Sequence, residues 1–291
     1  MSYLHIANLY RPEAQRILEF KQVFVMEKIH GTSAHVAWKD NALRFFSGGS
    51  KHETFVALFA EEQLQAAFSE MANPDVTVYG EAYGGKIQGM SKVYGPKIRF
   101  VAFEVKIGGS WLSVPQACDI AVNRLGLDFV CYDLSATDIE SLNEHRDANS
   151  AQAMKNGMGE HPREGIVIRP PFEVILNNGE RLIAKYKTEA FQERTREPKI
   201  GEDLKTLTDA EAAADEWVTN NRMEHVLDSL CSESVDVQDI TATGAVIKRM
   251  YQDIEREGAG ELEFSKMLSR AIGQKTAKMF KQRLQTRINE G

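Results

Sequence analysis

The residue with the clearest capacity for chemistry is Lys28, which follows an apolar, strand-like run from Val23 to Met26. His30 and a glycine turn at Gly31 come directly after it, so the amine stands at a strand end. A neutral amine is a nucleophile, but a free lysine has a pKa of about 10.4, and only about one in a thousand is neutral near pH 7.4. Lowering that pKa by roughly 3 units, or about 4 kcal/mol, requires burial and neighbouring positive charge such as a metal ion. Taken alone, this pattern is more typical of an ordinary surface lysine.

Two glutamates stand at the ends of other strand-like runs. Glu81 ends one such run and has glycines on both sides, Gly80 and Gly84, which let a ligand or a backbone approach closely. Glu164 begins an apolar run, where its carboxylate suits a hard divalent cation such as Mg²⁺ or Mn²⁺. For each residue the alternative is a solvent-facing strand glutamate.

Two lysines, Lys185 and Lys187, lie two residues apart in a further strand-like run. Strand geometry places both ammonium groups on the same face. Two like charges side by side cost energy unless an anion lies between them, so the pair indicates an anion site. The alternative is a pair of edge-strand lysines that discourage aggregation.

An aromatic residue, Phe103, lies within the apolar run that also contains Glu104. Alternation along a strand puts Phe103 with Val101 and Val105 on one face, and Glu104 with Ala102 on the other. Phe103 is then either a core residue or, beside a nucleotide site, a ring that stacks on a base.

The bulk properties are those of an ordinary globular protein. The 291 residues allow one large domain and a small one, and 43% hydrophobic and 26% charged residues are usual values. Apolar runs are too short to cross a bilayer, the first residues lack a signal-peptide pattern, and three scattered cysteines form no disulfide framework. We therefore expect a cytoplasmic protein with no membrane partner.

The charge is unevenly distributed along the chain. A net charge of −7 argues against coating nucleic acid by bulk electrostatics. From Phe264 to Asn289, however, the sequence has no acidic residue and seven basic ones: Lys266, Arg270, Lys275, Lys278, Lys281, Arg283 and Arg287. This run is either a local phosphate-binding face or a solvated helix face.

Hydrophobic periodicity predicts mixed structure in the first two thirds of the chain. The expected strands are 23–29, 34–38, 42–46, 76–81, 98–106, 164–169 and 181–187. Helices are expected over 54–71, from Pro115 to near Gly126, and from the capping-box pattern Thr137-x-x-Glu140. Residues 154–162 are expected to form an irregular loop.

After Phe191 the pattern is helical. One helix is expected to open at Thr208-x-x-Glu211, a second carries a stripe that includes Ile240 and Met250, and the next stripe includes Met267 and Leu268. The fold class is therefore α+β, with a mixed domain over 1–195, a linker at about 196–203 and a small all-helical domain over 204–291.

In order, these segments resemble the motif series of the covalent nucleotidyltransferases, which comprise polynucleotide ligases and messenger-RNA capping enzymes. Most members have aspartate where His30 stands, and Glu27-Lys28-Ile29-His30-Gly31-Thr32 closely resembles the RNA ligase 2 family of ATP-dependent, nick-sealing RNA ligases. The resemblance covers roughly Val23 to Phe191. It implies an antiparallel-sheet nucleotidyltransferase (ATP-grasp-like ligase) domain.

The resemblance also implies a mechanism and a role for each residue. Lys28 would attack ATP to give a lysyl–AMP, the AMP would move to an RNA 5′-phosphate, and a 3′-hydroxyl would then seal the strand. By this resemblance, His30 would orient the leaving pyrophosphate or its phosphates, and Lys185 and Lys187 would contact the α-phosphate. Glu164 would bind the catalytic magnesium. The residues that would bind the nucleotide are Glu27, Ile29, Glu81, Phe103 and Glu164.

Three points stay open. The family has an arginine between the first two motifs, and either Arg44 or Lys51 is a candidate for that place. The basic run suggests Lys275, Lys278 and Lys281 as RNA contacts. We expect a monomer, but the sequence does not reveal the physiological RNA.

Two alternatives compete with an RNA ligase. One is a DNA ligase or a capping guanylyltransferase, against which His30 and the helical C-terminal region count. The other is a non-catalytic nucleic-acid-binding module, against which the retained Lys28, Glu81 and Glu164 count.

Overall fold

In the described part of the chain, every strand lies in the first of two units, Met1–Ala190 and Phe191–Gly291. The computed structural model describes residues 3–73, 75–202 and 206–290. The boundary at 190/191 precedes the expected domain end at 195. The expected end of the linker at 203 and the start of the helical domain at 204 lie outside the described residues.

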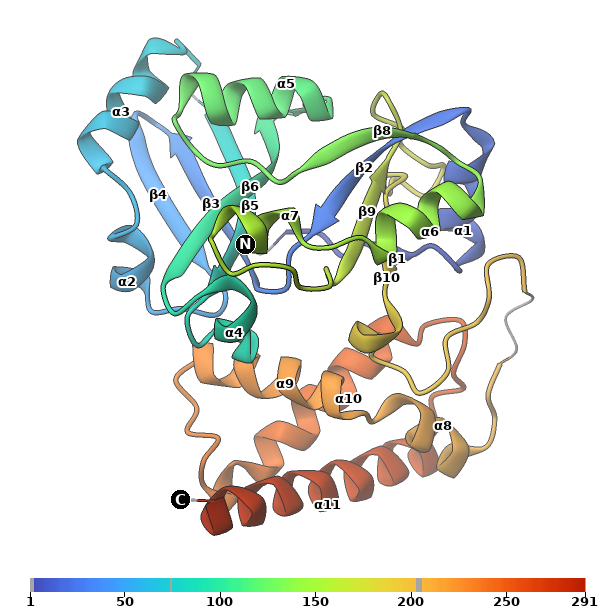
Figure 1. Cartoon of the computed structure of the whole chain (residues 1–291). Helices are drawn as coiled ribbons and strands as arrows, with labels where there is room; N and C mark the ends of the chain where they lie inside the picture. The colour runs from blue at the N-terminus through green and yellow to red at the C-terminus, as the bar shows by residue number, and fades with distance from the viewer. Residues whose placement is uncertain (1–2, 74, 203–205, 291) are drawn as a thin grey trace. The chain divides into compact units, whose positions relative to one another are not determined.

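Two five-stranded sheets form the frame of the first unit (Figure 1). Sheet A has the order β1 (Ala7–Asn8), β10 (Ala184–Lys187), β9 (Gly165–Arg169), β2 (Gln22–Lys28) and β8 (Tyr132–Ala136). Sheet B has the order β4 (Ala42–Ser47), β3 (Thr32–Lys39), β5 (Asp75–Gly84), β6 (Ile98–Ile107) and β7 (Ser110–Trp111). Neighbouring strands are antiparallel except β1 and β10, which are parallel. The predicted mixed α+β class is confirmed, and β1, β7 and β8 are strands that the sequence patterns missed.

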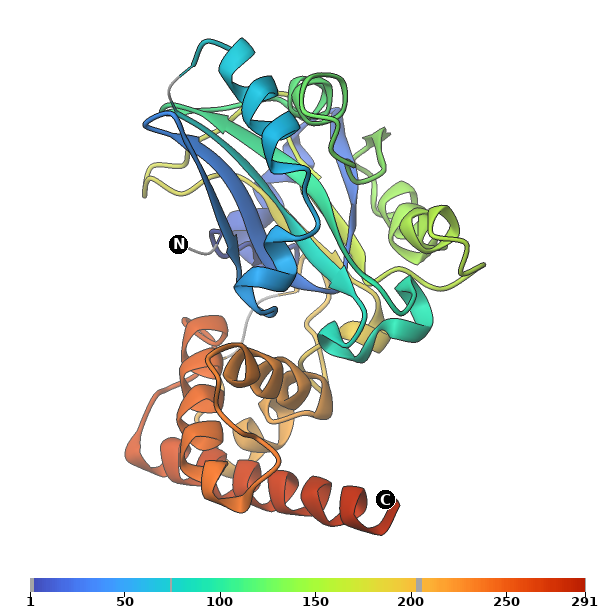
Figure 2. The ribbon, with the colours of Figure 1, turned by 90° about the vertical axis from the view of Figure 1, so that its left-hand side faces the viewer.

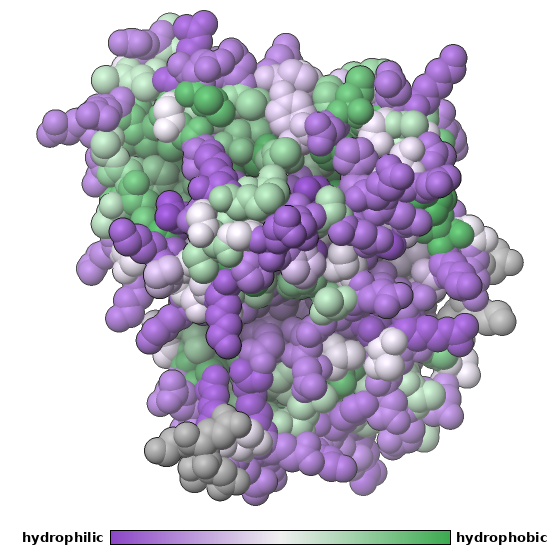
Figure 3. Space-filling model, in the orientation of Figure 1, coloured by the Kyte–Doolittle hydropathy of each residue, from purple (hydrophilic) through white to green (hydrophobic). Residues whose placement is uncertain are grey.

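Short helices connect and cover these strands. They are α1 (Pro12–Gln15), η1 (Arg16–Glu19), α2 (His52–Val56), α3 (Glu61–Glu70), η2 (Ile87–Gly89), α4 (Ser91–Tyr94), α5 (Val114–Asp119), the π-helical turn η3 (Ile120–Arg124), α6 (Ile139–Asp147), α7 (Ala151–Lys155) and η4 (Glu189–Phe191). In the space-filling view, hydrophobic residues reach the surface near α3 and α5, among hydrophilic ones (Figure 3).

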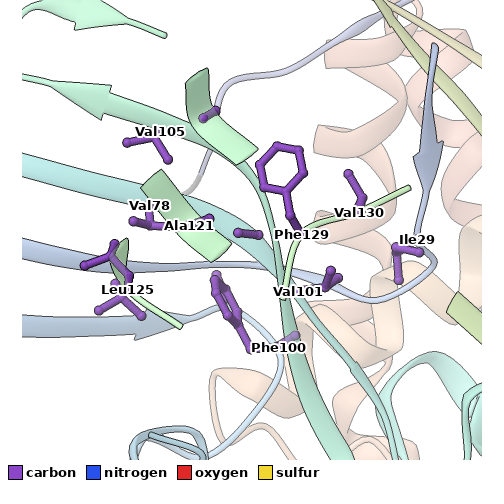
Figure 4. Close-up of a cluster of buried hydrophobic side chains, with 14 of the residues drawn as sticks. Ile29, Val78, Phe100, Val101, Val105, Ala121, Leu125, Phe129 and Val130 are labelled. Carbon is purple, nitrogen blue, oxygen red and sulfur yellow. The ribbon is translucent and has the colours of Figure 1, made fainter. Parts of the chain in front are cut away.

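The hydrophobic core lies beneath these helices and draws on both sheets. Val78, Val101 and Val105 of sheet B pack with Leu125 and Phe129, which follow α5 (Figure 4). Burying such side chains contributes about 1.5–3 kcal/mol each, so this cluster is a main source of the unit's stability. It also fixes the ends of β2 and β5, where the candidate site residues lie.

Tertiary packing overrides three local predictions. The single helix expected over 54–71 is wrong, because the chain breaks between α2 and α3 and Phe59 packs against the rings of Phe45, Phe55 and Phe100. Helix α6 is capped by Asp138 rather than Thr137. Residues 154 and 155 were expected in the irregular loop but form the end of α7, a helix that Ser150 caps at its N-terminus.

The second unit is helical, as predicted (Figure 2). Its helices are α8 (Ala210–Trp217), α9 (Asn220–Ser232), η5 (Ile240–Ala242), α10 (Thr243–Glu257) and α11 (Lys266–Glu290). Besides Ala271, the buried residues of α11 in the described part of the chain recur every four positions, at Leu268, Ile272, Thr276, Phe280 and Leu284. Since an α-helix has 3.6 residues per turn, this stripe rotates by about 40° per step and lets one helix pack against both α8 and α10.

Some details of this unit differ from the sequence patterns. Met267 was placed in the buried stripe but is 74% exposed, and Ile240 lies in η5 and is 50% exposed. Asp209, not Thr208, caps α8, because its carboxylate accepts the backbone N–H groups of the first turn. No helix in the described residues combines the length and the apolarity needed to cross a lipid bilayer.

Candidate functional site

The strand register of sheet A brings the key residues together. In the antiparallel pairing, Lys28 of β2 and Lys187 of β10 both stand opposite Gly165 of β9. The two lysines therefore flank the start of β9 from either side, although 159 residues separate them along the chain. Glu164 immediately precedes Gly165 and is placed between them.

The carboxylate of Glu164 is the centre of this cluster. Its Oε2 lies 2.9 Å from the Nζ of Lys28 and 3.4 Å from the Nδ1 of His30, and its Oε1 lies 3.1 Å from the Nζ of Lys187. The side chain of Glu164 has no exposed surface, whereas that of Lys28 is 23% exposed. Lys28 thus connects a buried anion to the solvent-accessible side of the site.

Charge balance keeps Glu164 ionised. Burial alone would raise the pKa of its carboxyl group, but Lys28, Lys187 and His30 together hold that pKa well below the usual value. The Nζ of Lys28 is held in this ion pair, so the pair must open before Lys28 can attack anything. A cation that bound Glu164 would compete with Lys28 and release it.

Two glycines make these close approaches possible. A Cβ at Gly31 would lie 2.4 Å from the carbonyl oxygen of Ala82 and 2.9 Å from the Cγ of Glu81, so the turn after Lys28 packs directly on β5. A Cβ at Gly165 would lie 2.2 Å from the carbonyl oxygen of Tyr186. Any other residue at these positions would push the strands apart and separate the charged groups.

Glu81 belongs to the same electrostatic environment. Desolvation raises the pKa of its carboxyl group to about 8, because the opposing effect of Lys28 is partly offset by the negative charge of Glu164. At neutral pH the carboxyl is therefore mainly protonated, and it can donate as well as accept a hydrogen bond. A neutral carboxyl next to an anion site also adds no repulsion for phosphate.

Glu27 and Ile29, although adjacent to Lys28, face other parts of the protein. Glu27 is buried, and it accepts hydrogen bonds from the hydroxyl of Ser150 at 2.5 Å and the backbone N–H of Gln152 at 3.2 Å. The side chain of Ile29 is 4% exposed and lies in the hydrophobic core (Figure 4). A nucleotide contact by Ile29 would therefore have to come from its backbone.

Phe103 and Glu104 do not obey the simple alternation expected of a strand. A β-bulge shifts the pairing so that Tyr79 opposes Glu104 while Gly80 opposes Ala102, and Phe103 is the extra residue. As a result both side chains contact Tyr3, with the Phe103 ring 4.9 Å from the Tyr3 ring and the Tyr3 hydroxyl donating to Glu104. The prediction that they occupy opposite faces was wrong.

A buried ionic cluster that no sequence pattern predicted joins the two sheets. Glu104 of β6 is 1% exposed and pairs with Arg169 of β9 at 2.7 Å and with Arg181 at 2.6 Å. The only signal in the sequence was a glutamate inside an otherwise apolar strand. Tyr94 was also missed: its hydroxyl accepts the backbone N–H of His30 at 3.3 Å and so fixes the turn beside Lys28.

The remaining candidates are distributed more widely. Lys185 is buried in β10, two residues before Lys187. Arg44 pairs with Asp40 at 3.2 Å, and Lys51 is an exposed residue at the N-terminus of α2, so the family's arginine position stays unassigned. In the second unit, Lys275 pairs with Asp215 at 2.6 Å, whereas Lys278 and Lys281 are exposed on α11.

The donor set limits how a divalent metal ion is held. Within the described residues, no group of three or more His, Cys, Asp or Glu side chains has the arrangement of a metal site. Magnesium, however, is commonly bound through one or two carboxylates together with waters and substrate phosphates. Glu164 is a buried, ionised oxygen donor with cations around it for phosphate, and this set fits a metal ion that arrives with a nucleotide.

Comparison with known proteins gives a family match. The family model described as RNA ligase matches residues 21–187, more than half of the chain. Among curated proteins, none matches the sequence significantly.

Solved structures give a fold match. Two Naegleria gruberi RNA ligase mutants, one with AMP and Mn and one with ATP and Mn, each give a TM-score of 0.51, at 15% and 17% identity. The same ligase with pyrophosphate gives a TM-score of 0.50 at 15% identity. Each match covers 66% of this chain but only 57% of the other, and identities this low show a shared fold.

The raised pKa of Glu81 leads to a prediction about stability. Because the folded pKa of about 8 exceeds the ordinary value of 4.5, folding takes up a proton between these values, and the contribution of Glu81 to stability falls as pH rises from about 4.5 to 8. We expect Glu81→Gln to leave the melting temperature of the ligand-free protein nearly unchanged at pH 5 and to raise it at pH 9. Thermal unfolding at both pH values measures this. Glu70→Gln, at an exposed position, is the matched control, and equal shifts in the two variants would contradict the prediction.

Proposed function

Since the chain belongs to the RNA ligase family, we propose that it is an ATP-dependent RNA ligase that joins a 3′-hydroxyl to a 5′-phosphate through a lysyl–AMP intermediate. The observation that carries this proposal is the convergence of Lys28, His30 and Lys187 on the buried carboxylate of Glu164. A nucleophilic amine, additional cations and one oxygen donor are the groups that adenylyl transfer needs.

In the first step the Nζ of Lys28 attacks the α-phosphorus of ATP. A nitrogen–phosphorus bond forms, the bond from phosphorus to the β-phosphate oxygen breaks and pyrophosphate leaves, while the proton lost by the amine passes to solvent water. Lys187 and Lys185 contact the α-phosphate and offset the charge on its oxygens in the transition state. The step starts only after Lys28 has left its ion pair with Glu164.

Other residues of the site orient the nucleotide. His30, held at its backbone by Tyr94, contacts the phosphates of the leaving pyrophosphate. Glu81, whose pKa of about 8 keeps it largely neutral, hydrogen-bonds the ribose hydroxyls. Phe103 stacks on the adenine, which requires the Tyr3 ring at 4.9 Å to share or leave that surface. Glu27 supports the base-binding segment through the cap of α7, and Ile29 contacts the nucleotide through its backbone.

Glu164 is the residue that would hold Mg²⁺ or Mn²⁺. A bound divalent cation supplies charge neutralisation at the phosphate oxygens. Glu164 is well suited to this role because its low pKa keeps it ionised over the physiological pH range.

Two further transfers complete the reaction. An oxygen of the RNA 5′-phosphate attacks the α-phosphorus and breaks the bond to Lys28, so that the RNA carries the AMP. The 3′-hydroxyl then attacks the 5′-phosphorus, seals the strand and releases AMP.

We propose that the preferred substrate is a nick in duplex RNA and that the protein acts as a monomer. Its three cysteines are free, as suits a reducing cytoplasm.

The two units would divide this work. The nucleotidyltransferase chemistry belongs to the first unit, which contains every residue of the Glu164 cluster. The second unit would bind RNA through α11, where Lys278 and Lys281 are exposed and Lys275 is already paired with Asp215.

The experiment that tests the proposal is covalent labelling. The protein is incubated with radiolabelled ATP or GTP and a divalent metal, then denatured and separated on a gel. Labelling by ATP supports the ligase, and labelling by GTP supports a capping-type guanylyltransferase. The absence of labelling and of any mass increase matching one AMP favours a non-catalytic binding module. Nicked RNA, nicked DNA, hybrids and single strands then define the substrate.

Lys28→Ala should abolish labelling by ATP, because no other residue replaces the amine at the end of β2. The same variant should still seal a nick that already carries a 5′-adenylate, since that step no longer needs the lysyl bond. Both are measured with labelled ATP and with a synthetic adenylated nick. Undiminished AMP attachment to the variant would contradict the assignment.

Glu164→Ala should lower the rate of AMP attachment by roughly 100-fold and raise the metal concentration needed, because one oxygen donor is lost. We expect the domain to remain folded, with a stability loss that is largest near neutral pH and shrinks as pH falls through the depressed pKa of Glu164. Metal titration of labelling and circular dichroism measure the two effects. Glu160→Ala, an exposed carboxylate of the preceding loop, is the control and should behave like wild type.

Charge reversal on α11 should weaken binding to nicked RNA. Lys278→Glu with Lys281→Glu is expected to reduce affinity by about tenfold or more at 0.1 M salt, and Lys275→Glu to add less because Lys275 is already paired. The control pair Lys199→Glu with Lys248→Glu changes the charge equally at exposed positions of the same unit. If the α11 variants bind and seal nicks as well as wild type, this surface does not contact RNA.

A further inference from the structure

A second group of cations lies in the first unit, next to the Glu164 cluster. Between Glu81 and Glu104 the sequence contains no acidic residue but four basic ones, Lys86, Lys92, Lys97 and Arg99. In a protein with a net charge of −7 this is a strong local excess of positive charge. We call the residues 85–99 that carry it the basic loop.

The topology brings the basic loop to the end of sheet B that the turn after Lys28 enters. The loop leaves the C-terminal end of β5 and returns at the N-terminal end of β6, since Gly84 pairs with Ile98. The N-terminal end of β3, which follows the Lys28 turn, lies at the same end of the sheet because Thr32 pairs with Ala82. The turn that follows Lys28 and the basic loop therefore lie at the same end of sheet B.

Several contacts fix the loop in this position. Its base is closed by a hydrogen bond from the backbone N–H of Gly85 to the carbonyl of Gly95 at 2.9 Å. Tyr94, which is fully buried, packs edge to face on Tyr83 at 5.2 Å, and its hydroxyl accepts the backbone N–H of His30 at 3.3 Å. The loop is thus attached to the segment that carries Lys28.

The four cations are exposed and not neutralised by the protein. Each side chain is exposed or reaches the surface, and none forms an ion pair with any residue that the structure describes. By contrast, two other lysines are neutralised within the protein: Lys155 pairs with Asp128 and Lys275 with Asp215. Like charges in one short loop repel each other unless an external anion binds there.

We propose that the basic loop binds the phosphate backbone of the RNA strand beside the joint, through Lys86, Lys92, Lys97 and Arg99. This inference rests on the proposed ligase function and adds to it a contact surface in the first unit. A polyanion is the fitting partner because several separate cations can each contact a successive phosphate, and exposed lysines contribute charge without base selectivity. The loop then positions the strand end near the lysyl–AMP.

The test uses two variants of the full chain that remove the same charge. The first is Lys86→Gln with Lys92→Gln and Lys97→Gln. The control is Lys21→Gln with Lys39→Gln and Arg124→Gln, three exposed residues without ion pairs among the described residues. Lys21 and Lys39 stand at the strand ends opposite to Lys28 and Thr32, roughly 20 Å or more away at about 3.3 Å per residue.

The affinity for nicked duplex RNA is measured at salt concentrations from about 50 to about 300 mM. The basic-loop variant should bind about 100-fold more weakly at 0.1 M salt, and the slope of log affinity against log salt should fall by about 2. The control should stay within about threefold of wild type. The rate of AMP attachment from ATP should be unchanged in both variants.

Three results overturn the proposal: equal RNA binding by the two variants, an unchanged salt slope, or a loss confined to AMP attachment, which would make ATP the partner of the loop. Failure of the proposed function looks different, because wild-type protein would then accept no AMP at all. The comparison of RNA binding by the two variants can still be read in that case. If the wild-type protein accepts AMP but the basic-loop variant binds RNA normally, the inference about the basic loop is wrong and the proposed ligase function is unaffected.

Discussion

The buried carboxylate of Glu164 is the constraint on which the rest of the site depends. A fully buried anion is costly unless cations surround it, and Lys28 and Lys187, with His30 beside them, provide that compensation from two separate segments of the chain. The same arrangement draws the proposed nucleophile, two proposed phosphate ligands and the proposed metal donor into one place. It also holds Lys28 in an ion pair, which has to open in the proposed reaction before Lys28 can attack ATP.

Backbone approach distances explain why this charge cluster can form. Glycines at positions 31 and 165 let the Lys28 turn contact β5 and let β9 contact β10 more closely than a Cβ would permit. A second buried ionic cluster, around Glu104, ties β6 to β9 on the neighbouring part of the two sheets. Each cluster is supported by the strand register, because a shift of one residue would turn the charged groups to the other face.

The charge distribution distinguishes the buried Glu164 cluster from the exposed cations that are proposed to bind RNA. The protein is acidic as a whole, which disfavours unselective coating of nucleic acid. Among the described residues, the basic loop of the first unit and the exposed part of α11 in the second each carry several basic residues close together. RNA binding by these segments, as proposed, would depend on local contacts and on the salt concentration, whereas burial shields the Glu164 cluster from salt.

The sequence by itself determined the α+β class, seven of the strands and the set of charged residues with capacity for chemistry, because strand alternation and strand-end position are local properties. It did not determine which of these residues meet. That Lys28 and Lys187 face each other across Gly165 follows from the register of β2, β9 and β10, which pairs residues far apart in the chain. Only the tertiary structure placed Glu27 at the cap of α7, Ile29 in the core and Phe103 in a bulge beside Tyr3. Those positions depend on long-range packing, and the local pattern of apolar and charged residues contains no record of it.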